Sequence, residues 1–228
     1  MPENKQRKVI MIICEGTTDE TALSVFTEIY RGSQVRFIVT RGDITTKKSG
    51  AANANALTAV NSVIRENMGR YGLKKGDILR VMHVMDTDGA FIPDDMVRQG
   101  ADGELSYHKD HIAAGDAEGI RKRNAVKRQN VSILYPKEKI GGVAYKAYYL
   151  SRNLEHALHG LDGALSTEDK MRLAEEFEAA YSEDADGFKM LLNSDELATP
   201  GEYAQTWRYI MDGAHSLERH SNLHLAIE

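Results

Sequence analysis

Runs of consecutive apolar residues alternate with helix-like patterns along the first part of the chain. The apolar runs predict strands at residues 8–14, 35–39, 78–85 and 131–135. Such runs are typical of strands that are covered on both faces. Apolar residues at helical spacing predict helices between them, at residues 17–30, 51–68 and 116–130. Strands that alternate with helices indicate a parallel sheet with helices on its faces.

The remaining segments are polar or purely helical in pattern. Residues 41–50 and 86–95 have the composition of loops, and residues 96–114 fit no single pattern. After Pro136 only helical patterns remain, at residues 142–160, 166–181 and 198–213. We therefore expect an α/β fold, a Rossmann-like parallel sheet flanked by helices. The expected domains are a core over residues 1–136 and a C-terminal helical extension over residues 137–228.

Charge is distributed unevenly along the 228 residues, whose formal net charge is −5. Residues 1–150 hold 23 Lys and Arg against 18 Asp and Glu, whereas residues 151–228 hold 6 against 16. This asymmetry suits a polyanion-facing core beside an acidic appendage. An ordinary solvated acidic surface explains the second part of the chain equally well.

We expect neither an export signal nor a membrane-spanning segment. No apolar run approaches the roughly 18 residues that cross a bilayer, and the polar residues 1–8 lead directly into a predicted strand. Cys14 is the only cysteine and cannot form an internal disulfide, which fits a reducing compartment. We expect a cytoplasmic protein without a membrane partner.

Carboxylates follow two of the predicted strands directly. Glu15 follows residues 8–14, and Asp86 and Asp88 follow residues 78–85. In parallel sheets, ligands bind beyond the carboxyl ends of the strands. Three converging carboxylates repel one another unless a cation joins them, and oxygen ligands suit Mg²⁺. Gly16 and Gly89 would let the backbone turn sharply beside a phosphate.

These two motifs carry a family resemblance. EGTTDE at residues 15–20 and DTDG at residues 86–89 resemble the Toprim domain of topoisomerases, primases and OLD-family nucleases, over roughly residues 8–136. The nearest likeness is to small bacterial OLD and RloB-like Toprim proteins, several of which act in phage defence. The resemblance implies that Asp86 and Asp88 hold Mg²⁺, for which Mn²⁺ substitutes. Glu15 would be a metal ligand or the general acid/base, and Glu20 a further ligand.

The implied activity is metal-dependent hydrolysis of phosphodiester bonds in DNA or RNA. Lys137, just past the last predicted strand, could steady the scissile phosphate, or be a loop lysine. Glu155 lies in a segment that resembles the Glu-bearing helix after the Toprim core of RloB-like proteins, and it could complete the metal site. Glu20 and Glu155 also have simpler interpretations, as a helix-dipole charge and an exposed glutamate respectively.

A basic cluster lies on the predicted helix at residues 116–130, and its members are Arg121, Lys122, Arg123, Lys127 and Arg128. Spread over a broad helix face, they could contact several phosphates of a nucleic acid. A solvated surface helix would have the same composition.

Two other functions stay open. DTDG also resembles the start of haloacid-dehalogenase phosphatases, in which Asp86 would attack phosphorus and Asp88 would act as general acid. In that family the motif usually ends the first strand, not the third. Alternatively, the chain is a non-catalytic Toprim module. No GxxxxGK[ST] motif occurs in it, so an ATPase would have to be a separate partner, and self-association is possible.

Overall fold

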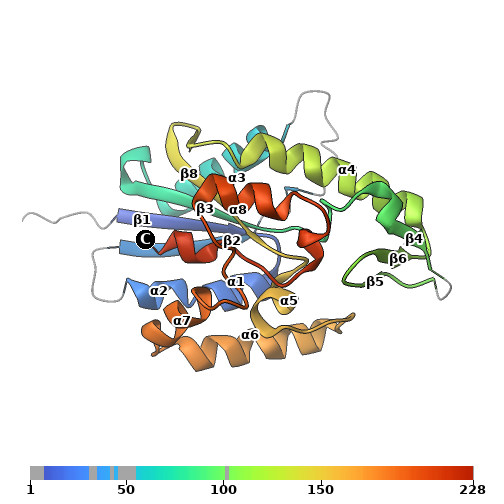
Figure 1. Ribbon diagram of the computed structural model, residues 1–228. Helices are drawn as coiled ribbons and strands as arrows, with labels where there is room; N and C mark the ends of the chain where they lie inside the picture. The colour runs from blue at the N-terminus through green and yellow to red at the C-terminus, as the bar shows by residue number, and fades with distance from the viewer. Residues whose placement is uncertain (1–7, 31–34, 42–43, 46–54, 101–102, 228) are drawn as a thin grey trace, which may run out of the picture.

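The computed structural model describes residues 8–30, 35–41, 44–45, 55–100 and 103–227. Its main sheet has five strands in the order β2-β1-β3-β8-β7 (Figure 1). Four of them are parallel: β1 (Lys8–Cys14), β2 (Val35–Arg41), β3 (Ile78–Asp86) and β8 (Val143–Leu150). The short β7 (Lys139–Ile140) pairs antiparallel with β8 at the edge. The α/β fold with a mostly parallel sheet is thus confirmed.

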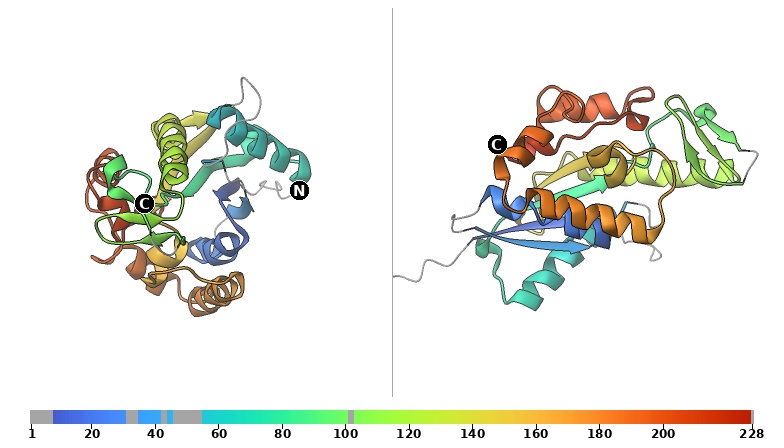
Figure 2. Two further views of the ribbon diagram at one scale, coloured as in Figure 1. Left: turned by 90° about the vertical axis from the view of Figure 1, so that its right-hand side faces the viewer. Right: turned by 90° about the horizontal axis from the view of Figure 1, so that it is seen from below.

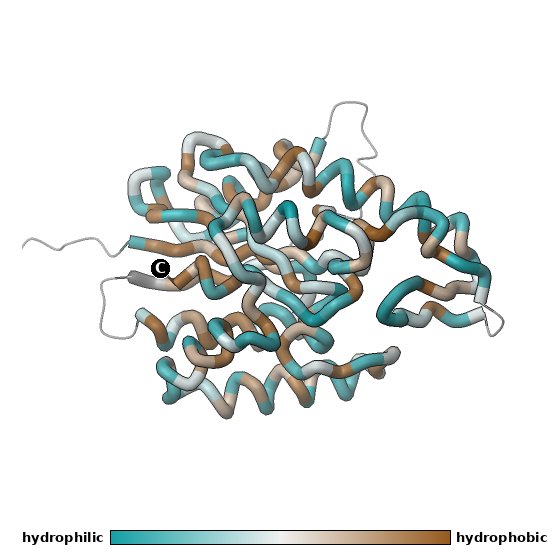
Figure 3. Tube along the Cα trace, in the orientation of Figure 1, coloured by the Kyte–Doolittle hydropathy of each residue, from teal (hydrophilic) through white to brown (hydrophobic). Residues whose placement is uncertain are grey.

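Helices cover both faces of this sheet (Figures 1 and 2). Ile10 and Ile12 of β1 face one apolar cluster, while Met11 and Ile13 face the other, as the alternation of side chains along a strand requires. The first cluster is formed with α1 (Thr17–Leu23), α2 (Phe26–Ile29), α5 (Leu154–His159), α6 (Thr167–Tyr181) and α7 (Ala185–Leu192). The second is formed with α3 (Ala56–Tyr71), α4 (Ala117–Leu134) and α8 (Tyr203–Ile210). Figure 3 shows the apolar strands enclosed between these layers.

A second, smaller sheet extends past the carboxyl ends of the main strands. It has the order β4-β6-β5 and consists of β4 (Val97–Gln99), β5 (Ser106–Tyr107) and β6 (Ile112–Ala114). Ile92, Val97 and Ile112 pack with Ala117 at the start of α4 and with Leu217. These strands occupy the segment whose sequence fits no single pattern.

The helix predicted at residues 17–30 is divided into α1 and α2, and α7 was not predicted. Two further predicted elements have a different secondary structure. Residues 131–135 are not a strand, because Val131 and Leu134 continue the buried face of α4 to its end. Residues 143–150 are not helical but form β8, which pairs with β3 from Tyr145 to Leu150. The sheet therefore is not confined to residues 1–136, since one of its inner strands comes after that boundary.

The order of the strands identifies where a ligand would bind. The connection after β1 leads to β2 on one side, and the connection after β3 leads to β8 on the other. In open α/β sheets, ligands bind where neighbouring connections diverge in this way. That place is the carboxyl end of β1 and β3, where Glu15 and Asp86 lie. Among the described residues, no helix has the length and apolarity that a bilayer crossing needs.

Candidate functional site

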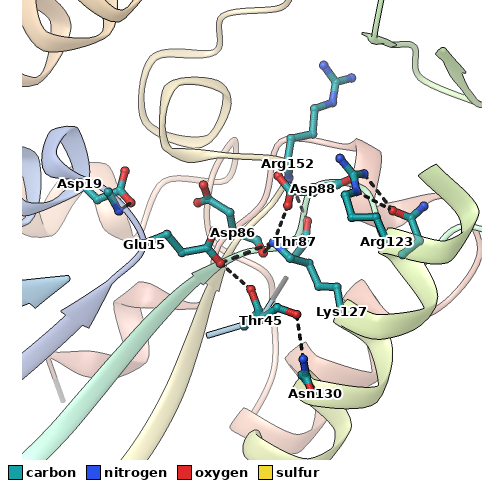
Figure 4. A network of polar contacts seen from close by, with 12 residues as sticks. Glu15, Asp19, Thr45, Asp86, Thr87, Asp88, Arg123, Lys127, Asn130 and Arg152 are labelled. Carbon is teal, nitrogen blue, oxygen red and sulfur yellow. Dashed lines mark hydrogen bonds and ion pairs between the residues drawn. The ribbon is translucent and has the colours of Figure 1, made fainter. Parts of the chain in front are cut away.

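Four carboxylates gather at the carboxyl ends of β1 and β3 (Figure 4). Glu15 follows β1, Asp86 is the last residue of β3, Asp88 lies in the turn after it, and Asp19 lies on α1. Burial, followed by the charges of Asp19, Glu15 and Asp88, raises the pKa of Asp86 well above its ordinary value. Among the described residues, none donates a hydrogen bond to the Asp86 carboxylate. The site therefore holds more negative charge than its own side chains neutralise.

Lys127 of α4 supplies the positive charge within this group. Its side chain is fully buried, and its Nζ donates to the Asp86 carbonyl oxygen at 2.8 Å. The same atom lies 3.5 Å from Glu15 Oε1 and forms a close ion pair with Asp88. Burial alone lowers the pKa of Lys127, but the charges of Asp88, Glu15 and Asp86 outweigh it. The pKa is raised overall, so the ammonium stays charged.

The turn that carries Asp88 is fixed by the end of β8. The Asp88 amide donates to the Arg152 carbonyl oxygen at 2.7 Å, and the Arg152 amide donates to Thr87 Oγ1 at 2.9 Å. Asp88 and Gly89 both have positive φ, 49° and 61°, a conformation that glycine and aspartate adopt more readily than most residues. A Cβ on Gly89 would lie only 2.5 Å from Leu217 Cδ2, so this position requires glycine.

Glu15 and Asp19 are held on the other side of the site. Thr45 Oγ1 donates to Glu15 Oε1 at 2.7 Å, and the Thr45 carbonyl accepts from Asn130 of α4 at 3.0 Å. The Gly16 amide donates to Asp19 Oδ2 at 2.8 Å. Burial is the main cause that raises the pKa of Asp19, and the charge of Glu155 adds to it.

Asp19, the residue before the predicted ligand Glu20, is an α1 carboxylate whose charge acts on Asp86. A role of Glu20 as a metal ligand stays a prediction. The missed signal is the position of Asp19 three residues after Gly16, where a carboxylate turns back to the backbone amide at the start of the helix.

Glu155 lies on the Asp19 side of the site. It is a buried residue of α5, which begins just after β8 reaches the carboxyl edge, and it pairs with Lys170 at 3.4 Å. It is therefore not an exposed glutamate on an amphipathic helix. Its charge acts on Asp19, whereas the carboxylates that raise the pKa of Asp86 are Asp19, Glu15 and Asp88.

Lys137 does not lie at this edge of the sheet. It follows the end of α4, two residues before β7 begins. The carbonyl of the neighbouring Glu138 accepts from the Tyr145 amide, and Tyr145 lies opposite Val81, so Lys137 lies beside the amino half of the sheet rather than beside the carboxylates. Its predicted place depended on a strand at residues 131–135, and that segment is the end of α4. Lys127, ten residues earlier, is the lysine at the acidic site.

The other basic residues of α4 mostly contact the protein itself. Arg123 donates to the Asp88 carbonyl oxygen at 2.9 Å, and Arg128 donates to the Ala90 carbonyl oxygen at 2.9 Å. Arg121 donates to the carbonyl oxygens of Asp94 and Val97. Lys122 is exposed and pairs with Glu118 at 3.4 Å. Lys127 was wrongly grouped with surface residues, because a fully buried side chain cannot bind nucleic acid at a surface.

The carboxylate oxygens of the site suit Mg²⁺, although the described side chains do not form a complete coordination site. Among the described residues, no group of three or more His, Cys, Asp or Glu side chains is arranged to hold a metal ion. Mg²⁺ takes only one or two carboxylates directly and keeps several waters. The Asp86 carboxylate, which has surplus negative charge around it and no hydrogen-bond donor among the described residues, fits a direct ligand. The ion would have to share Glu15 and Asp88 with Lys127.

Comparison of the chain with models of known families, with curated proteins and with solved structures finds no significant match.

Proposed function

We propose that this chain is a Mg²⁺-dependent nuclease of Toprim type that hydrolyses phosphodiester bonds in DNA or RNA. The observation that carries the proposal is the meeting of Glu15, Asp86 and Asp88 at the point where the β1 and β3 connections diverge. The raised pKa of Asp86 supports it, because a divalent cation would relieve the repulsion that burial and the neighbouring carboxylates create.

The residues of the acidic site would have separate roles in such a reaction. Asp86 and Asp88 would hold the ion, which supplies Lewis-acid stabilisation of the phosphoryl oxygens and an activated water. Glu15, oriented by Thr45, would take or return a proton at the attacking or leaving oxygen. Lys127 would hold the carboxylates of Glu15 and Asp88 in position through its ion pairs with them.

Incubation with plasmid DNA, single-stranded DNA, transfer RNA and ribosomal RNA tests this function. We expect cleavage of at least one substrate with Mg²⁺ or Mn²⁺, none with EDTA, and none by the Asp86→Ala variant. The exposed Asp95→Ala variant is the matched control and should cleave like the unaltered protein. Absence of metal-dependent cleavage of every substrate would overturn the proposal.

Two competing functions would give different results. A haloacid-dehalogenase-like phosphatase would turn over p-nitrophenyl phosphate and accumulate phosphate on Asp86. A non-catalytic module would show no activity with any partner, and the internal pairing of Lys127 with Glu15 and Asp88 favours this alternative. A cytoplasmic role in phage defence, with a separate ATPase or a second copy as partner, belongs to the nuclease proposal and rests on the Toprim resemblance.

A further inference from the structure

Two adjoining hollows lie at the amino edge of the sheet, opposite the acidic site. Each has a volume of about 370 Å³, and both are bordered by Asn61 of α3 and Gly141 of the β7–β8 turn. Arg65 and Lys75 line the first hollow. The second is lined by Lys137 and Lys139. We call these four side chains and the hollows between them the amino-edge patch.

The turn that separates the hollows is built to lie close to its neighbours. Gly141 and Gly142 have φ of 62° and 83°, which suits a two-residue hairpin turn. A Cβ on Gly141 would lie 2.1 Å from Asn61 Oδ1, so a larger residue here would displace the Asn61 side chain of α3. A Cβ on Gly142 would lie 3.2 Å from Lys75 Nζ. The turn therefore brings three sequence segments with basic residues together.

The four basic side chains of the amino-edge patch are exposed. None of them makes an ion pair with another described residue. Some basic residues elsewhere differ in this respect: Arg172 pairs with Asp169 and Glu176, and Lys189 pairs with Asp186. The arginines of α4, by contrast, donate to backbone carbonyls.

The patch is separate from the acidic site. β3 runs from one edge to the other over 9 residues. At a rise of about 3.3 Å per residue, this separates the two edges by roughly 26 Å. Glu138, next to Lys137, is bonded to Tyr145, whose β3 partner Val81 lies five residues, or roughly 16 Å, before Asp86. That distance exceeds the screening length of about 8 Å at physiological salt. A ligand of the patch therefore needs neither the carboxylates nor a metal ion.

We propose that the amino-edge patch binds the phosphodiester backbone of a nucleic acid. The partner must present several anionic groups over a short length to use four cations at once. Between those cations the hollows are lined by Leu57, Ile64, Met68 and Ile140. A strand in which charged phosphates alternate with uncharged sugars and bases matches this alternation. The inference goes beyond the proposed function, because a patch of this kind can bind nucleic acid in a protein that does not cleave it.

Fluorescence anisotropy in EDTA tests the patch without any contribution from metal. The probes are labelled single-stranded RNA, single-stranded DNA and duplex DNA of equal length, titrated at several salt concentrations. The Arg65→Ala/Lys75→Ala/Lys137→Ala/Lys139→Ala variant should bind at least about 10-fold more weakly at low salt. For each phosphate that the variant no longer neutralises, its slope of log K against log salt should fall by about 0.7 for single strands, or about 0.9 for duplex.

A pair of double variants controls for net charge. Lys137→Ala/Lys139→Ala should weaken binding, whereas Arg172→Ala/Lys189→Ala, which removes the same charge from the opposite face, should not. Unchanged affinity and slope in the fourfold variant, with its circular dichroism spectrum intact, would overturn the proposal. Tighter binding of polyglutamate than of any polynucleotide would also overturn it, in favour of an acidic protein partner.

The nuclease proposal and the patch can fail separately. Asp86→Ala should abolish cleavage and leave anisotropy unchanged if both are right. Patch-dependent binding without cleavage would retain the patch and reject the nuclease. If the fourfold variant cleaved and bound nucleic acid as well as the unaltered protein, the patch proposal would be rejected and the nuclease proposal retained.

Discussion

The ammonium of Lys127 lies 3.5 Å from the carboxylate of Glu15, although 112 residues separate them in the chain. The contact joins α4 to the end of β1, and the neighbouring bond to the Asp86 carbonyl joins it to β3. Lys127 thereby makes α4 one wall of the acidic site. A buried charge of this kind is costly unless it is paired, so the helix and the carboxylates depend on one another.

Replacing Lys127 with Met should therefore destabilise the protein. The variant leaves Glu15 and Asp88 without their shared cation, and removal of one partner of a buried ion pair costs about 3–5 kcal/mol. In EDTA the midpoint of thermal unfolding should fall. Mn²⁺ should then raise it more than in the unaltered protein, because the ion no longer competes with an ammonium.

The control is Lys122→Met, a change on the exposed side of the same helix. Its midpoint should stay near that of the unaltered protein, since exposed ion pairs contribute about 0–1 kcal/mol. If Mn²⁺ raised the midpoint of the Lys127 variant less than that of the unaltered protein, Lys127 and a metal ion would not share the carboxylates.

In EDTA, Asp86→Asn should stabilise the protein, whereas Lys127→Met should destabilise it. The folded protein holds the pKa of Asp86 above its value of 3.8 in a model compound. The folded state thus binds more protons than the unfolded state above about pH 4, and stability falls as the pH rises from there to the raised pKa. The amide removes this loss, so the variant should be more stable than the unaltered protein at pH 8, with a difference that shrinks at pH 4.

The same variant should lose stabilisation by Mn²⁺, which in the unaltered protein grows with the logarithm of the free ion concentration. Denaturant titrations at both pH values, with and without Mn²⁺, provide the measurement. Asp95→Asn, an exposed change of the same kind, should alter neither quantity. A less stable Asp86→Asn protein at pH 8 in EDTA would show that its charge is compensated in the folded state.

The sequence predicted the carboxylates because their signal is local. Glu15 and Asp86 each follow an apolar run that could be read without knowing its neighbours. β8 was missed because its Ala, Tyr and Leu residues are compatible with a helix, and its strand form depends on pairing with β3, where Tyr145 lies opposite Val81. Lys137 was misplaced for a different reason, since the strand predicted at residues 131–135 is the end of α4.

Lys127 carried a signal that was overlooked. Ala117, Asn124, Lys127, Val131 and Leu134 form one buried stripe along α4. A lysine in the middle of an apolar stripe indicates a buried partner rather than a surface ligand. Which carboxylates it meets still depends on how α4 packs over β1 and β3, and a single sequence does not contain that information.

Arg128→Ala tests whether the basic residues of α4 support the structure. The arginine donates to the carbonyl oxygens of Ala90 and Ile92 and pairs with Asp94. Its loss leaves partly buried acceptors without a donor, at a cost of about 1–3 kcal/mol. Urea unfolding should show this loss, while the salt dependence of nucleic-acid binding should not change. A stable variant with a reduced salt slope would instead assign Arg128 to the nucleic acid.

His83 should make the protein sensitive to acid. It is fully buried on β3, its Nδ1 lies 2.8 Å from Tyr145 Oη, and burial lowers its pKa from 6.5 to about 3. Above pH 6.5 the ring is neutral in both states and has no effect on pH dependence. As the pH falls below 6.5, His83 binds a proton in the unfolded chain but not in the folded chain. Stability is therefore lost progressively down to about pH 3, by at most about 1.4 kcal/mol per pH unit.

His83→Gln removes this titration and retains an amide that can contact Tyr145. The free energy of unfolding, measured in urea between pH 7 and pH 4, should fall less steeply with decreasing pH in the variant than in the unaltered protein. The difference in slope should correspond to the uptake of at most one proton on unfolding. His156, whose pKa is lowered to about 4, adds to the acid loss in both proteins, so the difference between the two curves isolates His83. The exposed His108→Gln variant should follow the unaltered protein. Parallel curves for His83→Gln and the unaltered protein would mean that His83 takes up its proton equally well in the folded and unfolded states.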